Sequence, residues 1–250
     1  MAELDVGELS AKYNLPEWVV REELEETMSE VLSERFAYPV DVVFLSSGGI
    51  EFRSFRYRDG VLKSSKLDIG LRFIKPLMLR LIDTLAHRLA AKRIVGDYER
   101  MKSLVHRLVT GCVVNATPGG ELYAEVGGSI GVCQRRDQPL SERGKYLPGQ
   151  TYRFYVKRIL PLRYGEDSKL EITLSRTSKS FVTRLLEDEL AAADIFDVKI
   201  KCISRIVGGL SRVRSSERIP QKIVRKISDE LKEKIYVECK RKRRLYNHKR

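Results

Sequence analysis

The spacing of hydrophobic and polar positions changes from helical to extended and back along the chain, which indicates three regions. In residues 1–101, apolar side chains recur every three or four positions after Pro16 and again from Ile74 to Met101. Two strand-like segments lie between these stretches, VDVVFL and IEFRSFRYRDGVLK, and the second contains the hairpin signal Asp59-Gly60. We therefore expect an α/β N-terminal domain that ends in a long connecting helix.

The first predicted helix is apolar on one face and acidic on the other. The acids expected on its solvent side are Glu22, Glu23, Glu25, Glu26 and Glu30. Such a face can meet a basic surface on a partner protein. Trp18, near the start of the same helix, is either a core residue or a docking anchor.

Residues 102–177 alternate with a period of two, which is typical of half-buried strands. Five short segments show the pattern, namely LVTGCVVNA, ELYAEVG, SIGVCQRR, TYRFYVKRIL and KLEITLS. Glycines and prolines mark turns between them. Five strands of this length suit an OB-type barrel, a fold that often binds oligonucleotides, with a free-standing sheet or another small barrel as alternatives. The motif Gly128-x-x-Gly131 falls between two of these strands and is interpreted as a turn.

Residues 178–250 return to mixed spacing. Ser178 is a candidate N-cap for a helix in which Phe181, Val182, Leu185 and Leu186 share a face. Two strands around Gly208-Gly209, a helix from Pro220 and a final strand follow. This order of helix, strand, strand, helix and strand resembles a KH-type fold. The fold class expected for the whole chain is therefore multi-domain α+β.

The formal net charge of +13 is concentrated at one end of the chain. Residues 199–250 contain 18 Lys and Arg against 5 Asp and Glu, whereas residues 1–198 contain 29 of each kind. Such asymmetry favours contact with a polyanion, usually nucleic acid, over a merely solvated basic tail.

Several classes of function find no support in the sequence. The three histidines and four cysteines lack the spacing of metal ligands, and no P-loop or hydrolase motif is present. We expect neither an enzyme nor a metal or cofactor site. The absence of a signal-like or membrane-spanning apolar run predicts a cytoplasmic protein with no membrane partner. No prediction of oligomeric state follows.

The segment from Leu174 to Leu190, LSRTSKSFVTRLLEDEL, followed by VKIKCISR, resembles the NusA family of bacterial transcription elongation and termination factors. In that family an OB-type barrel ends in Leu-Ser-Arg-Thr, and a helix then opens the first KH domain. LPEWVVREELEETMSEVLSERF and LAAKRIVGDYERM also resemble the family's first helix and its connecting helix. The resemblance covers most of the chain, but its specific motif is the segment from Leu174 onward.

The resemblance implies three domains and two partners. Residues 1–101 would dock on RNA polymerase, residues 102–177 would form an RNA-binding OB barrel, and residues 178–250 would form a KH-like domain with a basic tail. The chain departs from the family in having one KH-like unit. It also lacks the Gly-x-x-Gly loop that clamps the RNA backbone.

Charge and aromatic rings must therefore supply much of the expected binding to nascent RNA. The candidate RNA-binding residues are Tyr123, Arg135, Arg136, Tyr155, Arg205, Arg212, Arg214, Lys222, Arg225, Lys226, Lys240, Arg241, Lys242, Arg243 and Arg244. For the two tyrosines, simple packing is the alternative. The expected function is a shortened transcription elongation, termination or antitermination factor. The alternatives are a polymerase-independent RNA-binding protein of ribosome assembly or translation and, with least support, an RNA-processing enzyme.

Overall fold

A computed structural model describes residues 5–45, 49–58, 61–162 and 169–239. The chain divides into two compact units. Unit 1 comprises residues 1–97 with 161–169, and unit 2 comprises residues 98–160 with 170–250. The last two regions expected from the sequence therefore belong to one unit.

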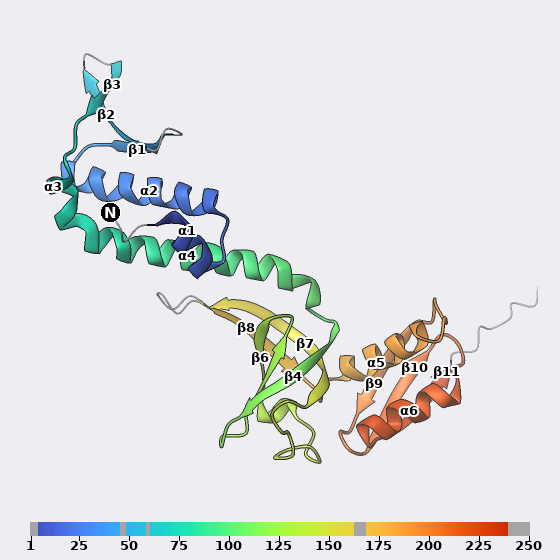
Figure 1. Cartoon of the computed structure of the whole chain (residues 1–250). Coiled ribbons are helices and arrows are strands. Elements are labelled where there is room, and N and C mark those ends of the chain that lie inside the picture. Colours follow the sequence, from blue (N-terminus) through green and yellow to red (C-terminus); the bar gives the residue numbers. More distant parts are fainter. Residues whose placement is uncertain (1–4, 46–48, 59–60, 163–168, 240–250) are drawn as a thin grey trace, which may run out of the picture. The chain divides into compact units, whose positions relative to one another are not determined.

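Unit 1 consists of a three-stranded antiparallel sheet, a long helix packed on it and a second long helix packed on the first. Its elements are α1 (Val6–Tyr13), α2 (Glu17–Phe36), β1 (Val40–Phe44), β2 (Ile50–Arg58), β3 (Val61–Leu67), α3 (Leu71–Ile74), the 3-10 turn η1 (Lys75–Leu77) and α4 (Met78–Met101), which continues past Asp97. Figure 1 shows α2 lying between β1 and α4, and these elements share one core.

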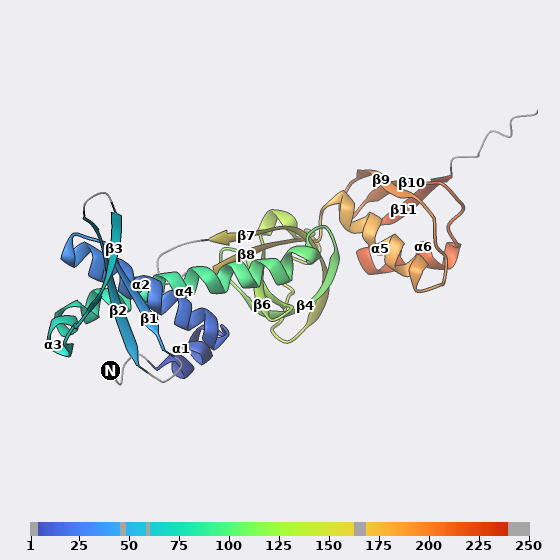
Figure 2. The ribbon, with the colours of Figure 1, turned by 90° about the horizontal axis from the view of Figure 1, so that it is seen from above.

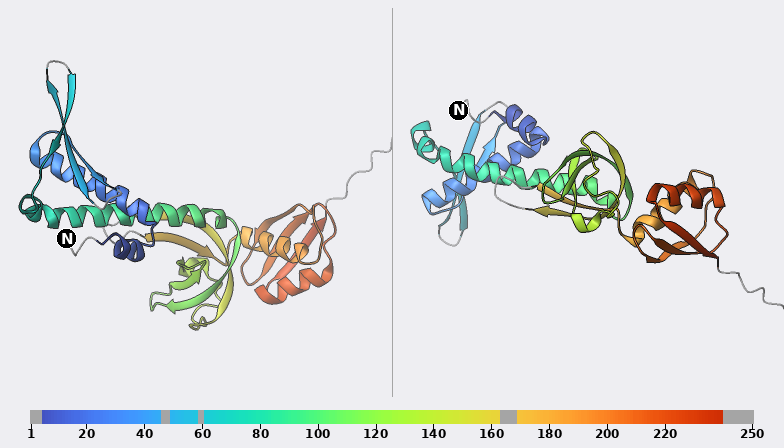
Figure 3. Two further views of the ribbon diagram at one scale, coloured as in Figure 1. Left: turned by 45° about the horizontal axis from the view of Figure 1, so that its top comes forward. Right: turned by 90° about the horizontal axis from the view of Figure 1, so that it is seen from below.

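The predicted hairpin is confirmed, because β2 and β3 pair antiparallel as far as Arg58 and Val61. Its turn residues, Asp59 and Gly60, lie outside the described residues. Since β1 pairs with β2 only up to Ser54, the end of the hairpin extends beyond the sheet as a two-stranded ribbon (Figure 3).

Of the acids predicted on the solvent side of α2, Glu22, Glu26 and Glu30 are exposed as expected and Glu25 is half-buried, but the expectation was wrong for Glu23. Glu23 is 2% exposed, and its carboxylate lies 2.7 Å from the Lys92 ammonium of α4. This hydrogen bond raises the pKa of Lys92. Arg88 of α4 pairs in the same way with Glu26 and Glu30. The cause is that α4 lies alongside α2 and brings its cations to the acids.

The first part of unit 2 is a closed five-stranded barrel. After η2 (Lys102–Leu104) come β4 (Leu108–Ala116), β5 (Leu122–Val126), β6 (Ser129–Cys133), η3 (Arg135–Asp137), β7 (Thr151–Leu162) and β8 (Lys169–Ser175). The strand order is β4-β5-β6-β8-β7, with β6 parallel to β8. This arrangement confirms the predicted barrel and is consistent with an OB-type fold.

Glycines permit two tight features of the barrel. Gly127 and Gly128 connect β5 to β6 with φ values of 56° and 79°, a left-handed turn that glycine adopts readily. A Cβ at Gly131 would lie 2.7 Å from Leu174 Cδ1, so the lack of a side chain lets β6 approach β8. The expected turn is therefore confirmed for Gly128, whereas Gly131 lies within β6.

The second part of unit 2 is a three-stranded sheet with two helices. Its elements are α5 (Lys179–Ala191), β9 (Ile200–Arg205), β10 (Leu210–Ser215), α6 (Gln221–Leu231) and β11 (Lys234–Cys239). β10 is central, antiparallel to β9 and parallel to β11. Both helices pack on the same side of the sheet (Figure 2). The order of these elements is the one predicted from the sequence.

None of the helices in the described part of the chain is both long enough and apolar enough to cross a bilayer.

Candidate nucleic-acid interface

The segment between the barrel and α5 is fixed by its own polar side chains. The Ser175 hydroxyl accepts hydrogen bonds from the amides of Thr177 and Ser178, and the Ser178 hydroxyl accepts one from Phe181 at 3.1 Å. Ser178 is thus the N-cap of α5, as predicted. The Ser-Arg-Thr-Ser sequence therefore ends the strand and begins the helix within a few residues.

Arg176, the centre of this segment, is buried and points into the barrel wall. Its guanidinium donates to both carboxylate oxygens of Glu142, at 2.7 and 2.9 Å, and to the Arg153 carbonyl. Burial alone would raise the pKa of Glu142, but the hydrogen bonds and charge of Arg176 outweigh it and lower that pKa. Arg176 therefore bonds to groups within the protein and is not available to contact RNA.

Arg153 joins the two parts of unit 2. From β7 it forms ion pairs with Glu189 of α5 and Glu230 of α6. Because these pairs span three elements, they hold the barrel against the helices. The charge of Arg153 is therefore already neutralised within the molecule.

The candidate residues of the barrel have different surroundings. Tyr123 is half-buried, and its hydroxyl donates to Glu121, which raises the pKa of Tyr123. Arg135 and Arg136, in η3, are exposed. The Arg135 stem lies beside Gly120, where an added Cβ would meet it at 3.0 Å. Tyr123 and the two arginines thus remain accessible.

Tyr155 does not fit the expectation of a base-stacking ring. It is 7% exposed, belongs to the core beneath α5 and α6, and hydrogen-bonds through its hydroxyl to His106 Nδ1 at 2.9 Å. The alternation in β7 does direct Tyr155 away from the barrel interior. However, the helices cover that side, so the packing alternative is the correct one.

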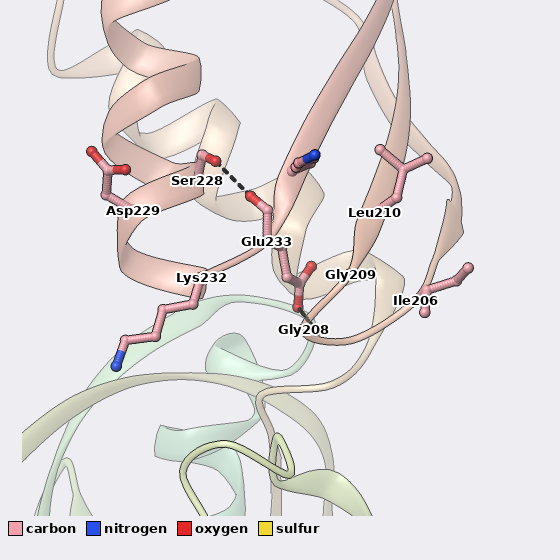
Figure 4. A pocket seen from close by; sticks show the side chains of 9 residues that line it. Ile206, Gly208, Gly209, Leu210, Ser228, Asp229, Lys232 and Glu233 are labelled. Atoms are coloured by element: carbon pink, nitrogen blue, oxygen red, sulfur yellow. Dashed lines mark hydrogen bonds between the residues drawn. The ribbon is translucent and has the colours of Figure 1, made fainter.

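Arg205 is also a correction. Its side chain is 1% exposed and lies 2.8 Å from the carboxylate of Glu233, itself fully buried. Glu233 further accepts hydrogen bonds from the Gly208 amide and the Ser211 hydroxyl. Figure 4 shows this glutamate beside the Gly208-Gly209 turn, with Lys232 directed away from it. A guanidinium so enclosed cannot reach a phosphate.

The remaining basic candidates lie on two opposite surfaces. Arg212 and Arg214 alternate with the buried Val213 and therefore occupy the sheet face that the helices leave open. Lys222, Arg225 and Lys226 lie on the outer side of α6, and Lys226 pairs with Glu189. Among the described residues, these basic candidates therefore do not form one continuous surface.

Residues 240–250 are not described, so the candidates Lys240, Arg241, Lys242, Arg243 and Arg244 lie outside the described residues. The last described residue, Cys239, pairs in register with Ser215 at the end of β10.

Three exposed residues of the open sheet face were missed by sequence reasoning, Lys201, Lys234 and Tyr236. Tyr236 is 57% exposed and is the register partner of Arg212. The signal was present in the last strand, where Tyr236 alternates with Ile235 and Val237. The alternation alone does not tell whether Tyr236 lies on the open or the covered face of the sheet, because that depends on where the helices pack.

No protein-family model matches this chain, and no curated protein matches it.

Proposed function

We propose that this protein is a NusA-like transcription elongation, termination or antitermination factor. It binds RNA polymerase through unit 1 and nascent RNA through unit 2. One observation carries the proposal: a closed barrel consistent with the OB type passes directly, through Leu174-Ser175-Arg176-Thr177, into a helix-strand-strand-helix-strand unit. That order matches the arrangement implied by the resemblance.

The second part of unit 2 would serve as a KH-like domain without the Gly-x-x-Gly clamp. In its place is one helix, α6, which follows Pro220 directly and contains no glycine. RNA binding in this proposal depends on exposed cations and aromatic rings, which contribute affinity with little sequence preference.

For polymerase docking, we propose Trp18 as the anchor residue of unit 1. Its side chain is 68% exposed, so the core alternative does not apply. The acids Glu23, Glu26 and Glu30 are paired with α4, so they are poor candidates for contacts with a basic partner surface. Exposed tryptophans are enriched among residues that contribute most to protein interfaces.

The variant Trp18→Ala tests this docking function. We expect the full chain to retain purified core RNA polymerase in a pull-down at moderate salt, and Trp18→Ala to weaken retention about tenfold or more. Tyr57→Ala, which removes another ring of unit 1 that is 77% exposed, is the matched control. Thermal melting should be nearly unchanged in both, because neither ring is in a core.

Equal retention by Trp18→Ala and the wild type would remove Trp18 from the interface. Failure of the wild-type chain to retain polymerase would overturn the proposed function. It would favour the alternative, a polymerase-independent RNA-binding protein of ribosome assembly or translation.

A further inference from the structure

The open face of the sheet β9-β10-β11 has an unusual composition for a surface without a cover. The residues that point away from the helices are Lys201, Ile203, Ser204, Leu210, Arg212, Arg214, Lys234, Tyr236 and Glu238. Four are cations and one is an anion, while Ile203 and Tyr236 are 38% and 57% exposed, respectively. An exposed ring among cations on a flat sheet is the composition of a surface that binds stacked bases.

Register places the key groups in adjacent rows. Across the strands, Arg212 lies between Ser204 and Tyr236, and Arg214 lies between Lys201 and Glu238. Arg212 and Tyr236 are therefore cross-strand neighbours on this face, and Arg214 lies one row further along β10.

The cations of this face are not used internally. Within the described residues, neither Arg212, Arg214, Lys201 nor Lys234 forms an ion pair, whereas Arg153, Arg176 and Arg205 each do. A polyanion is the complementary occupant.

We propose that this face binds single-stranded RNA, with one base stacked on Tyr236 and the adjoining phosphates held by Arg212, Arg214 and Lys201. The proposal rests on the RNA-binding part of the proposed function and names its site. It differs from a KH clamp because the contact lies on the sheet and requires no glycine loop. A single strand is favoured over a duplex, since only unstacked bases offer a free face to an aromatic ring.

The test is a fluorescence-anisotropy titration of the full chain with a labelled ten-nucleotide oligouridine and with an RNA duplex. We expect Tyr236→Ala to weaken binding of the single strand about fivefold or more, and Tyr236→Phe, which keeps the ring, to bind like the wild type. Binding of the duplex should change little in either variant. Tyr57→Ala is the control for loss of an exposed tyrosine.

A second pair of variants separates the two basic surfaces. Arg212→Ala with Arg214→Ala should flatten the slope of log affinity against log salt by about 1.4, which corresponds to two phosphate contacts. Lys222→Ala with Arg225→Ala makes the same change in net charge on α6 and should have the smaller effect. Circular dichroism checks that each variant is folded.

Three results would overturn the proposal. If the wild type binds oligouridine but Tyr236→Ala binds equally well, the stacking site is wrong while the proposed function stands. If the α6 pair has the larger effect, the RNA lies on the helical side. If polyglutamate carrying the same total charge as the RNA displaces it, and Tyr236→Ala does not change the affinity for RNA, the face is a docking surface for an acidic protein. Failure of the wild type to bind any RNA would instead overturn RNA binding as a whole.

Discussion

At the scale of single residues, arginine has two roles in unit 2. Arg176 and Arg205 are buried against Glu142 and Glu233, whereas Arg212 is exposed and has no anionic partner among the described residues. A buried pair contributes little net stability, but removing one partner leaves an uncompensated charge and costs about 3–5 kcal/mol. Positive charge in the sequence is therefore not the same as charge available to RNA.

The Arg176–Glu142 pair predicts a specific dependence of stability on pH. Because the pKa of Glu142 in the folded protein is below the ordinary value of 4.5, the stability from this pair is present above pH 4.5. It is lost as the pH falls through the lower folded value. Glu142→Gln should therefore lower the free energy of unfolding by about 3 kcal/mol at pH 7, and the difference from the wild type should narrow toward pH 3.

Urea denaturation at several pH values measures this difference. Glu217→Gln, at an exposed carboxylate, is the control and should follow the wild type throughout. A difference for Glu142→Gln that stays constant from pH 7 to pH 3 would show that the ion pair is not its cause.

At the scale of elements, the barrel depends on the close approach of β6 and β8. Gly131 and Leu174 lie where these parallel strands meet, and the space beside Gly131 is already filled. The connection to α5 starts at the end of the same strand, because β8 ends at Ser175 and Ser178 caps α5. Disturbing this contact should therefore affect both parts of unit 2.

Gly131→Ala should destabilise the protein by about 1–3 kcal/mol, because the new methyl group would overlap the Leu174 side chain. Gly96→Ala makes the same chemical change within α4, where nothing lies within 4 Å of the new group. It should stabilise that helix by up to about 1 kcal/mol. Denaturant melts of both variants provide the comparison, and equal effects would contradict the crowding argument.

The elements were predictable from the sequence, because alternation and glycine turns report local structure directly. All five strands of the barrel and the capped helix after Ser178 lie where expected. What covers each face was not predictable. The alternation along β7 correctly predicts that Tyr155 points out of the barrel, but α5 and α6, which follow later in the sequence, bury it. The same limit applies to Glu23 and Arg205, whose partners lie 69 and 28 positions away in the chain.

At the scale of the whole molecule, charge is divided between the units. Residues 1–198 are neutral by count, and the excess of +13 lies in residues 199–250, within unit 2. Part of that excess is on the open sheet face and part on α6, while further cations lie beyond Cys239. The division is what a factor needs if one unit meets a protein and the other meets RNA by phosphate attraction.

The most direct measurement compares binding of the full chain to a stalled transcription elongation complex and to the same transcript free in solution. If unit 1 contacts polymerase while unit 2 holds the emerging RNA, the two sites act together, and affinity for the complex should exceed that for free RNA by about a hundredfold. Shortening the emerged RNA should remove most of that gain. Equal affinity for the complex and the free transcript would contradict the account.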